Sequence, residues 1–173
     1  DVTLTMSATQ ANGSTVTGAG SLAVTGAGVT TLNLSNVASD VDLSAVNTGG
    51  AIGTLTFGTI GASQTVTLTG DQASGKTITG TGSVIVESLA ATTNLSSVSA
   101  SAVTLQLGAD VTYTGTFNTN PAITLDTDSH GTARALDITG ATNLPASIAL
   151  DDDVTLTMSA TQASGSTVTG TGT

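Results

Sequence analysis

The sharpest chemical pattern in the chain is an acidic stretch at residues 126–137, which reads DTDSHGTARALD. Numbered as a twelve-residue calcium loop, it places Asp126 at position 1, Asp128 at position 3 and Asp137 at position 12. Calcium is a hard cation that prefers oxygen ligands arranged around a sharp glycine turn. We therefore predict that Asp126, Asp128 and Asp137 bind Ca²⁺ weakly. The alternative is a solvated acidic turn, because aspartate replaces the longer bidentate glutamate and no flanking helices are expected.

Catalytic chemistry finds little support in the residue types. His130 is the single histidine, cysteine is absent, and no GxSxG, P-loop or HExxH motif occurs. The Gly-rich GAGS and GTGS segments lie between expected strands, and no helix comes after them to bind a phosphate group, so they are interpreted as turns. We predict that the chain is not an enzyme and uses no organic cofactor.

Thr-x-Thr triplets recur along the chain, for example at residues 3–5, 54–56 and 155–157, each of which reads Thr-Leu-Thr. Ranks of threonine hydroxyls on a flat β face suit an ice-binding surface, which is one interpretation of these triplets. Alternation along a half-buried strand already explains them, because the leucine faces inward and the threonines face outward. Their irregular spacing along the chain also argues against a regular array of hydroxyls.

Composition limits the elements that can position these residues. Aromatic residues make up 2% of the 173 residues, so any core is thin and built from Val, Leu, Ile and Ala. Abundant Thr, Val and Gly are typical of short strands joined by turns. A single Glu, a single Lys and a single Arg cannot supply the charged face of a soluble amphipathic helix. We expect an all-β fold without helices.

The charge balance excludes several classes of partner. The formal net charge is −10 at pH 7, so there is no cationic patch to bind nucleic acid or an anionic membrane. The sequence has no apolar run of about 18 residues, and membrane insertion is not expected. Without cysteine, neither disulfides nor thiolate metal sites can form. Scarce Lys and Arg leave few trypsin sites, which is consistent with a secreted protein on the cell surface.

A long-range repeat is the strongest signal in the sequence. Residues 1–21 and 153–173 are identical at 18 of 21 positions. The differences are Asn12/Ser164, Ala19/Thr171 and Ser21/Thr173. Such near-identity at a distance of 152 residues (1 to 153) is typical of an array of duplicated units. We interpret residues 1–152 as one full period and residues 153–173 as the start of the next, and we expect the natural protein to be longer.

Weaker repeats lie inside the period. The segment VTLTGDQASGKTITGTGSVIV at residues 66–86 restates residues 2–24 with two residues deleted. A degenerate third unit begins near residue 122, and all three units share an Asn-Leu step and then an apolar strand. The period therefore contains sub-repeats that start near residues 2, 66 and 122, with no compositional shift that would mark a linker between them.

Short expected strands separated by Gly, Asn, Ser and Asp favour one fold over another. We predict a parallel β-solenoid, or β-helix, with roughly 20 residues per coil, because small inward residues fit a narrow core and each coil covers the edge of its neighbour. The alternative is a string of tandem Ig-like β-sandwiches with a domain boundary near Gln64. Sandwich strands are usually longer and their cores thicker than this composition supplies.

The segments SATQASGSTVTGTGT and DQASGKTITGTGSVIVESLAATTNLSSV resemble the Ala/Thr/Gly-rich tandem repeats of very large bacterial surface proteins, which are often adhesin-like. The resemblance implies export, great length and surface display, and it transfers no site residue. We predict a structural repeat of an extracellular fibre, sheath or surface layer that associates with itself. The alternative is the stalk or binding region of a large bacterial adhesin, which would contact a cell surface or a glycan.

Overall fold

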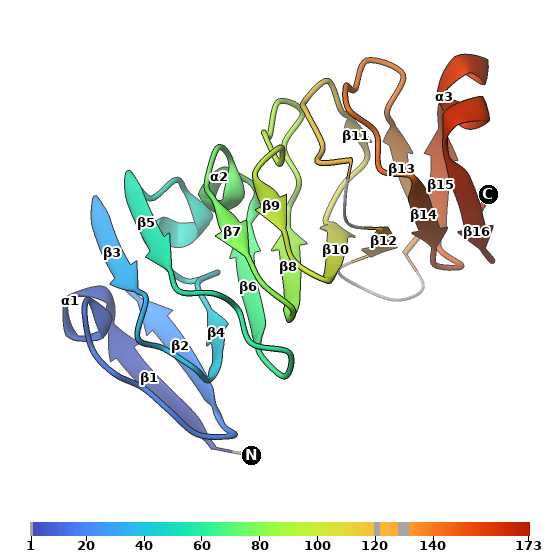
Figure 1. Ribbon diagram of the computed structural model, residues 1–173. Coiled ribbons are helices and arrows are strands. Elements are labelled where there is room, and N and C mark those ends of the chain that lie inside the picture. Colours follow the sequence, from blue (N-terminus) through green and yellow to red (C-terminus); the bar gives the residue numbers. More distant parts are fainter. Residues whose placement is uncertain (1, 120–121, 128–131) are drawn as a thin grey trace.

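The computed structural model describes residues 2–119, 122–127 and 132–173, and Asp128 and His130 of the expected calcium loop lie outside these ranges. The expected all-β class is confirmed: strands dominate, and most belong to one large parallel sheet. Figure 1 shows these strands following one another along the molecule, with the two chain ends at opposite ends of the row.

The large sheet has nine strands, and their order in the sheet is their order in the sequence. All neighbouring strands in it are parallel, with a register offset that ranges from 18 residues between Thr3 and Ser21 to 25 between Asp40 and Thr65. The strands are β1 (Thr3–Ser7), β2 (Ser21–Thr25), β4 (Asp40–Asp42), β6 (Thr65–Thr69), β8 (Ser83–Glu87), β10 (Ala102–Leu107), β12 (Ile123–Thr127), β14 (Ser147–Leu150) and β16 (Thr167–Gly170).

Three smaller parallel sheets occupy the connections between the strands of the large sheet. They are β3 (Thr31–Leu34) with β5 (Thr54–Phe57), β7 (Ile78–Thr79) with β9 (Val98–Ser99), and β11 (Val111–Thr112) with β13 (Arg134–Asp137) and β15 (Val154–Thr157). Every strand pair in the described chain is parallel. Ig-like sandwiches consist of antiparallel sheets, so the sandwich alternative does not fit this pairing.

The register stacks apolar side chains into continuous columns on the inner face of the large sheet. One column contains Leu22, Val41, Val66, Val84, Val103, Ile123 and Ile148, and the next contains Val24, Leu43, Leu68, Val86, Leu105, Leu125 and Leu150. All of these side chains are buried. Because alternate residues point to opposite faces of a strand, the intervening residues, such as Ala23, Thr67, Ile85 and Thr104, line the outer face.

Two of the three aromatic rings lie together in the core. Tyr113 and Phe117 are buried, and their ring centroids are 4.5 Å apart at an interplanar angle of 35°. The Tyr113 hydroxyl donates a hydrogen bond to the carbonyl of Thr93 at 2.6 Å, so its polar end is satisfied. Burial raises the pKa of Tyr113. The otherwise thin aliphatic core is therefore widened locally by one aromatic pair.

The expectation of no helix is wrong at several places. Short helices α1 (Ala8–Ala11), α2 (Gly70–Ala73) and α3 (Ala160–Gly165) come after strands β1, β6 and β15, and a single 3-10 turn, η1 (Asn47–Gly49), lies after β4. Each α-helix begins at a Ser or Thr whose side chain accepts from the backbone N–H three residues later, where a Gln side chain bonds back to the cap. This capping box stabilises a single turn without an amphipathic face, which is why composition did not reveal it.

The first two sub-repeats are equivalent in three dimensions, and their equivalent residues are separated by a constant number of residues. Gln10 occupies the position of Gln72, and the capping residue Ser7 that of Thr69, so equivalent residues lie 62 apart (10 to 72, 7 to 69). Strands β1 and β6 obey the same rule, because the first residue of each pairs with the first residue of the next sheet strand. In the structure, residues 3–25 correspond to residues 65–87 without the two-residue deletion that the sequence comparison introduced.

Candidate functional site

The two described aspartates of the predicted calcium site lie in two different sheets. Asp126 lies on β12 of the large sheet, Asp137 ends β13 of the three-stranded sheet, and Asp128 lies outside the described residues. The Asp126 carboxylate accepts from the backbone N–H of Thr127 at 2.7 Å. Within residues 2–119, 122–127 and 132–173, no three His, Cys, Asp or Glu residues form a group that could hold a metal ion. Calcium binding therefore stays a prediction that depends on Asp128.

The Asp137 carboxylate has a defined structural partner. It accepts hydrogen bonds from the backbone N–H of Thr139 at 2.9 Å and from the Thr139 hydroxyl at 2.8 Å. The backbone bond first, and then the hydroxyl bond, lower the pKa of Asp137 from its ordinary value. This geometry is a local turn in which the carboxylate binds the backbone two residues on.

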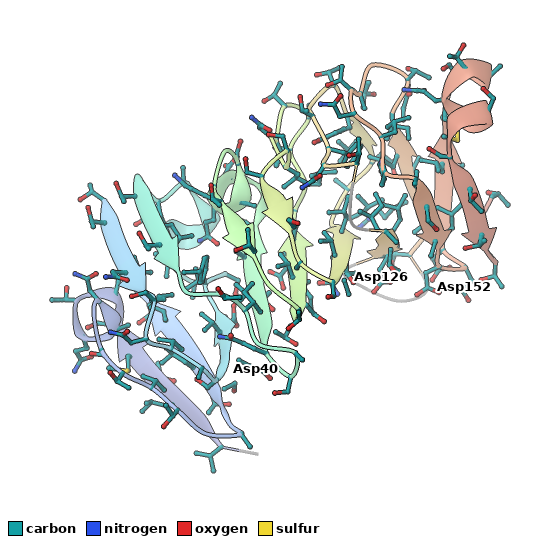
Figure 2. The ribbon with its side chains drawn as sticks, in the orientation of Figure 1. Asp40, Asp126 and Asp152 are labelled. Atoms are coloured by element: carbon teal, nitrogen blue, oxygen red, sulfur yellow. The ribbon has the colours of Figure 1, made fainter. Side chains whose placement is uncertain are left out.

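Other aspartates also bind backbone N–H groups at the ends of strands. Asp40 accepts from Thr65 at 2.7 Å, Asp110 from Ala135 at 2.9 Å, and Asp42 from Ser44 at 2.9 Å. Figure 2 places Asp40, Asp126 and Asp152 along the lower side of the molecule in that view. The carboxylates of Asp40, Asp42 and Asp110 thus satisfy backbone donors near the ends of strands and also carry negative charge.

The triplets at residues 3–5, 54–56 and 155–157 lie in three different sheets. The first is on β1 of the large sheet, the second on β5 of a two-stranded sheet, and the third on β15 of the three-stranded sheet. Two short hydroxyl pairs do form along these strands: the Thr3 hydroxyl pairs with that of Ser21 at 3.0 Å, and Thr155 with Thr173 at 3.1 Å.

The two ends of the large sheet are the places where the core is uncovered. Among the described residues, the exposed large hydrophobic side chains are Val2 (78%), Leu4 (48%) and Val168 (40%). Val2 and Leu4 lie at the β1 end, where they line a hollow of about 200 Å³ with Val16. Val168 lies on β16 at the other end. Leu4 and Val168 belong to the column that contains Leu22 and Ile148, and the side chains of this column are buried in the strands between β1 and β16. Each end of the large sheet therefore exposes apolar side chains of the kind that form the core.

The two copies of the 21-residue repeat fold alike locally where they are described. In both copies, a Ser side chain caps the helix through the N–H of the Gln three residues later, at 3.3 Å for Ser7 and Gln10 and 3.3 Å for Ser159 and Gln162. In both, the last residue of the repeat donates its N–H to the carbonyl of the second, a valine, at 3.0 Å.

Their surroundings differ on the side that faces the preceding part of the chain. Gln162 Nε2 donates to the carbonyl of Ile138 at 2.7 Å and to that of Ala141 at 3.4 Å, whereas Gln10 is exposed and its Nε2 donates to no described residue. Gln72 makes the same kind of contact as Gln162, with two backbone carbonyls of the turn at residues 43–46, at 2.8 and 2.9 Å.

The side that faces the later part of the chain shows the reverse difference. In the first copy, Ala8 and Ala11 of α1 are buried, and their neighbours include residues 26–33. In the last copy, the equivalent Ala160 and Ala163 of α3 are exposed. Among the described residues, the first copy thus has no neighbour on its preceding side, and the last copy has none on its later side.

The two copies also lie in different sheets. Strand β1 belongs to the nine-stranded sheet, but its equivalent β15 belongs to the three-stranded sheet. Strand β16, equivalent to residues 15–18, joins the large sheet, whereas in the first copy Val16 makes only an isolated bridge with Val37. The 152-residue period therefore does not return the chain to the same sheet.

A shallow groove of about 600 Å³ runs over β5 and the segment after α2. Its lining includes Thr54, Thr56, Phe57 and Lys76, and the Lys76 Nζ donates to the carbonyl of Gly53 at 2.7 Å. The ring at residue 57 is only partly buried and lies outside the aromatic pair of the core. An apolar ring beside hydroxyls and one cation is a surface that can contact a polar ligand.

The glutamines at the helices are the functional candidates that sequence reasoning missed. A recurring Ser/Thr-x-x-Gln pattern at residues 7–10, 69–72 and 159–162 was visible in the sequence. It is a known helix-start signature, but the further bond from the Gln amide to the preceding turn is a tertiary contact.

No described helix is long and apolar enough to cross a membrane. Searches of family models, of curated proteins and of solved structures each found no match to this chain.

Proposed function

We propose that the chain is a segment of a parallel β-solenoid, in which the offset between paired strands, 18 to 25 residues, is the length of one coil. Three observations support this fold. The strand order of the large sheet is the order of the sequence, the connections between its strands carry smaller parallel sheets, and the register stacks equivalent side chains into columns. Parallel strands need crossover connections, and short strands on each connection are how a coil supplies them.

We further propose that the protein is a structural repeat unit of an extracellular fibre, sheath or surface layer and that its copies associate end to end. The observation that carries this proposal is the uncovered cross-section at each end, where Val2 and Leu4 are exposed beside β1 and Val168 is exposed on β16. Unpaired strand edges bind other strands, and a head-to-tail contact that does not close propagates as a filament.

Composition agrees with a mechanical role outside the cell. The surface is rich in Thr, Ser and Asp, the net charge is −10, and cysteine is absent. Like charge limits lateral clumping, while the ends carry few charges that would oppose stacking. Catalytic activity and a membrane-spanning role are not part of the proposal.

A second candidate function is the stalk or binding region of a bacterial adhesin. The groove over β5 favours it, because Phe57, Thr54, Thr56 and Lys76 combine an apolar ring with hydroxyls and a cation. Such a surface suits a glycan of a host or of a neighbouring cell. An ice-binding surface is a third candidate, and the distribution of the triplets over three sheets gives it no support.

The experiment that tests the proposal compares the full chain with Val2→Asp and Thr67→Asp variants by sedimentation velocity over a wide range of concentrations. Val2 is 78% exposed, so the first variant places a charge on the uncovered end without disturbing the core. Thr67 lies on β6 in the middle of the large sheet and serves as the matched control for added charge.

We expect the unmodified chain and Thr67→Asp to grow in size with concentration and Val2→Asp to grow much less, because an unpaired charge would be buried at the contact. Small-angle scattering should show elongated particles in each case. A strictly monomeric chain at high concentration would overturn self-association, and a compact spherical particle would overturn the solenoid.

A further inference from the structure

The two copies of the 21-residue repeat, residues 1–21 and 153–173, are covered by the rest of the chain on opposite sides. The copy at residues 153–173 is covered on its preceding side: Val154 is 1% exposed, and Gln162 binds the turn at Ile138 and Ala141. The copy at residues 1–21 is covered on its later side, where Ala8 of α1 is buried. Among the described residues, the surfaces that are exposed in one copy are those that are covered in the other.

We propose that the partner of the β1 end is the segment from Arg134 to Ala141 of a second copy of this chain, and that residues 1–21 bind it in place of that copy's own residues 153–173. This inference rests on the proposed self-association and changes its surface: the β1 end binds the segment at residues 134–141, and β16 of the second copy, with Val168, is displaced from the contact. The occupant is fixed by the sequence, because residues 1–21 and 153–173 differ at three positions only.

The register of the contact comes from β13 and β15. In the chain, Ala135 faces Thr155 and Leu136 faces Leu156. Substituting the equivalent residues places Ala135 of the second copy beside Thr3, and its Leu136 beside Leu4. The Leu4 side chain is 48% exposed in the free end, and the contact covers it with a leucine from the buried core.

Gln10 provides the polar part of the contact. By equivalence with Gln162, its Nε2 donates to the carbonyls of Ile138 and Ala141 in the second copy. These two residues bound a tight turn, in which the Ala141 N–H donates to the Ile138 carbonyl at 2.9 Å. Gln72 binds the turn at residues 43–46 in the same way, so the chain uses this contact twice internally. A strand slipped by one residue would present the wrong face and separate the amide from both carbonyls.

Exchange of the two segments keeps the set of contacts nearly constant. The second copy loses the bonds of residues 153–173 to β13 and β14, and in this proposal it gains the equivalent bonds from residues 1–21. The incoming segment is already ordered by its pairing with β2, whereas the displaced one is exposed along all of β16 and most of α3. Releasing a loosely held segment returns its conformational entropy, and local opening of such an end supplies the route.

A disulfide trap tests the register directly, because the full chain contains no cysteine. Thr3→Cys in one preparation and Ala135→Cys in another are mixed in equal amounts, incubated and oxidised. Neighbouring positions on parallel strands are within reach of a disulfide. We expect a cross-linked product of two chains, several-fold more abundant than in a control mixture in which Thr67→Cys replaces Thr3→Cys.

Two further variants establish the mechanism. A single chain with both Thr155→Cys and Ala135→Cys should form its disulfide internally, which shows that these variants fold and that the geometry permits the bond. Adding Gln10→Ala to the Thr3→Cys chain should reduce the yield of cross-linked dimer. Thr9→Ala, a change at an exposed residue of the same helix, should leave the yield unchanged.

The outcomes separate the two proposals. If the chain associates in sedimentation but the Thr3 and Ala135 cysteines cross-link no better than the control, copies meet through another surface and this inference is wrong while self-association stands. If the chain neither associates nor cross-links, both are wrong. Cross-linking that is insensitive to Gln10→Ala overturns the role assigned to the glutamine.

Discussion

At the scale of single residues, the buried side-chain amide of Gln72 holds helix α2 against the backbone turn at residues 43–46. Gln72 is fully buried, and it uses its Oε1 to cap α2 and its Nε2 to bind the carbonyls of Leu43 and Val46. Each of these carbonyls also accepts one backbone N–H, from Val46 and Gly49 respectively. The two carbonyls therefore satisfy both amide protons of a side chain that burial removes from water. Gln10 has the same capping role without the second contact, which makes it a natural comparison.

We predict that Gln72→Glu lowers the free energy of unfolding by about 2 kcal/mol, because the carboxylate keeps the acceptor but loses the donor and buries a charge. Urea unfolding followed by circular dichroism measures this. The control is Gln10→Glu, which makes the same chemical change at an exposed cap and should leave the unfolding free energy nearly unchanged. Equal effects of the two variants would show that the caps, and not the bonds to the preceding turn, matter.

Asp137 allows a prediction about pH. Hydrogen bonds from Thr139 lower its pKa, so the folded state favours the charged form. A lowered carboxyl pKa contributes stability above the unfolded-state pKa, and this contribution is lost as the pH falls through the folded-state value.

We expect Thr139→Val to raise the pKa of Asp137 toward its ordinary value, because the hydroxyl bond is removed while the larger effect of the backbone N–H stays. Titration of the carboxyl group by NMR measures the shift. Thr124→Val, at another exposed threonine, is the control and should leave Asp137 unchanged. An unchanged pKa in Thr139→Val would mean that the hydroxyl does not bind the carboxylate in solution.

At the scale of elements, close approach between successive strands of the large sheet depends on glycine. A Cβ on Gly82, just before β8, would overlap the backbone oxygens of Gly61 and Gln64 in the segment before β6. The Gln64 carbonyl also accepts from the N–H of Ser83 at 2.9 Å, so the backbones cannot separate without losing this bond. Gly61 itself has open space around the equivalent Cβ position.

We predict that Gly82→Ala destabilises the fold by about 1–3 kcal/mol, because the added methyl group forces two backbone segments apart. Gly61→Ala is the matched control, with no atom in the way, and it should be neutral or stabilise the fold by up to about 1 kcal/mol through the unfolded state. Thermal unfolding of both variants under the same conditions tests this. A similar loss in both would indicate that backbone freedom, not contact, makes glycine necessary at these positions.

At the scale of the whole molecule, the repeat and the coil do not share a common length. Thr3 and Ser147 occupy the same register position of the large sheet, whereas Thr155, the repeat equivalent of Thr3, comes eight residues later (147 to 155) in another sheet. In the proposed solenoid, the first strand of each period therefore lies in a different sheet from the first strand of the preceding period, as β15 does from β1. Surface features such as the β5 groove would be distributed around a long array instead of along one side.

Much of the architecture could be predicted from particular residues. Alternating Val, Leu and Thr in segments such as residues 65–69 and 83–87 determined strands with one buried face, and those strands are β6 and β8. The scarcity of aromatic residues indicated a thin aliphatic core, which the columns through Val66 and Leu68 form. The repeat at residues 1–21 and 153–173 was evident from identity alone.

Other features depend on contacts between residues far apart in the sequence, and only the tertiary structure decided them. Sequence identity placed residues 2–6 and 154–158 in the same kind of strand but could not show that they lie in different sheets, because the sheet depends on how many residues each earlier turn of the chain uses. The Gln72 bond to Leu43 spans 29 residues, and the pairing of the two core aromatic rings depends on the shape of the surrounding core. The local alternation of apolar and polar residues determines which face of a strand is buried. The number of residues in all the preceding turns of the chain determines which other strand pairs with it.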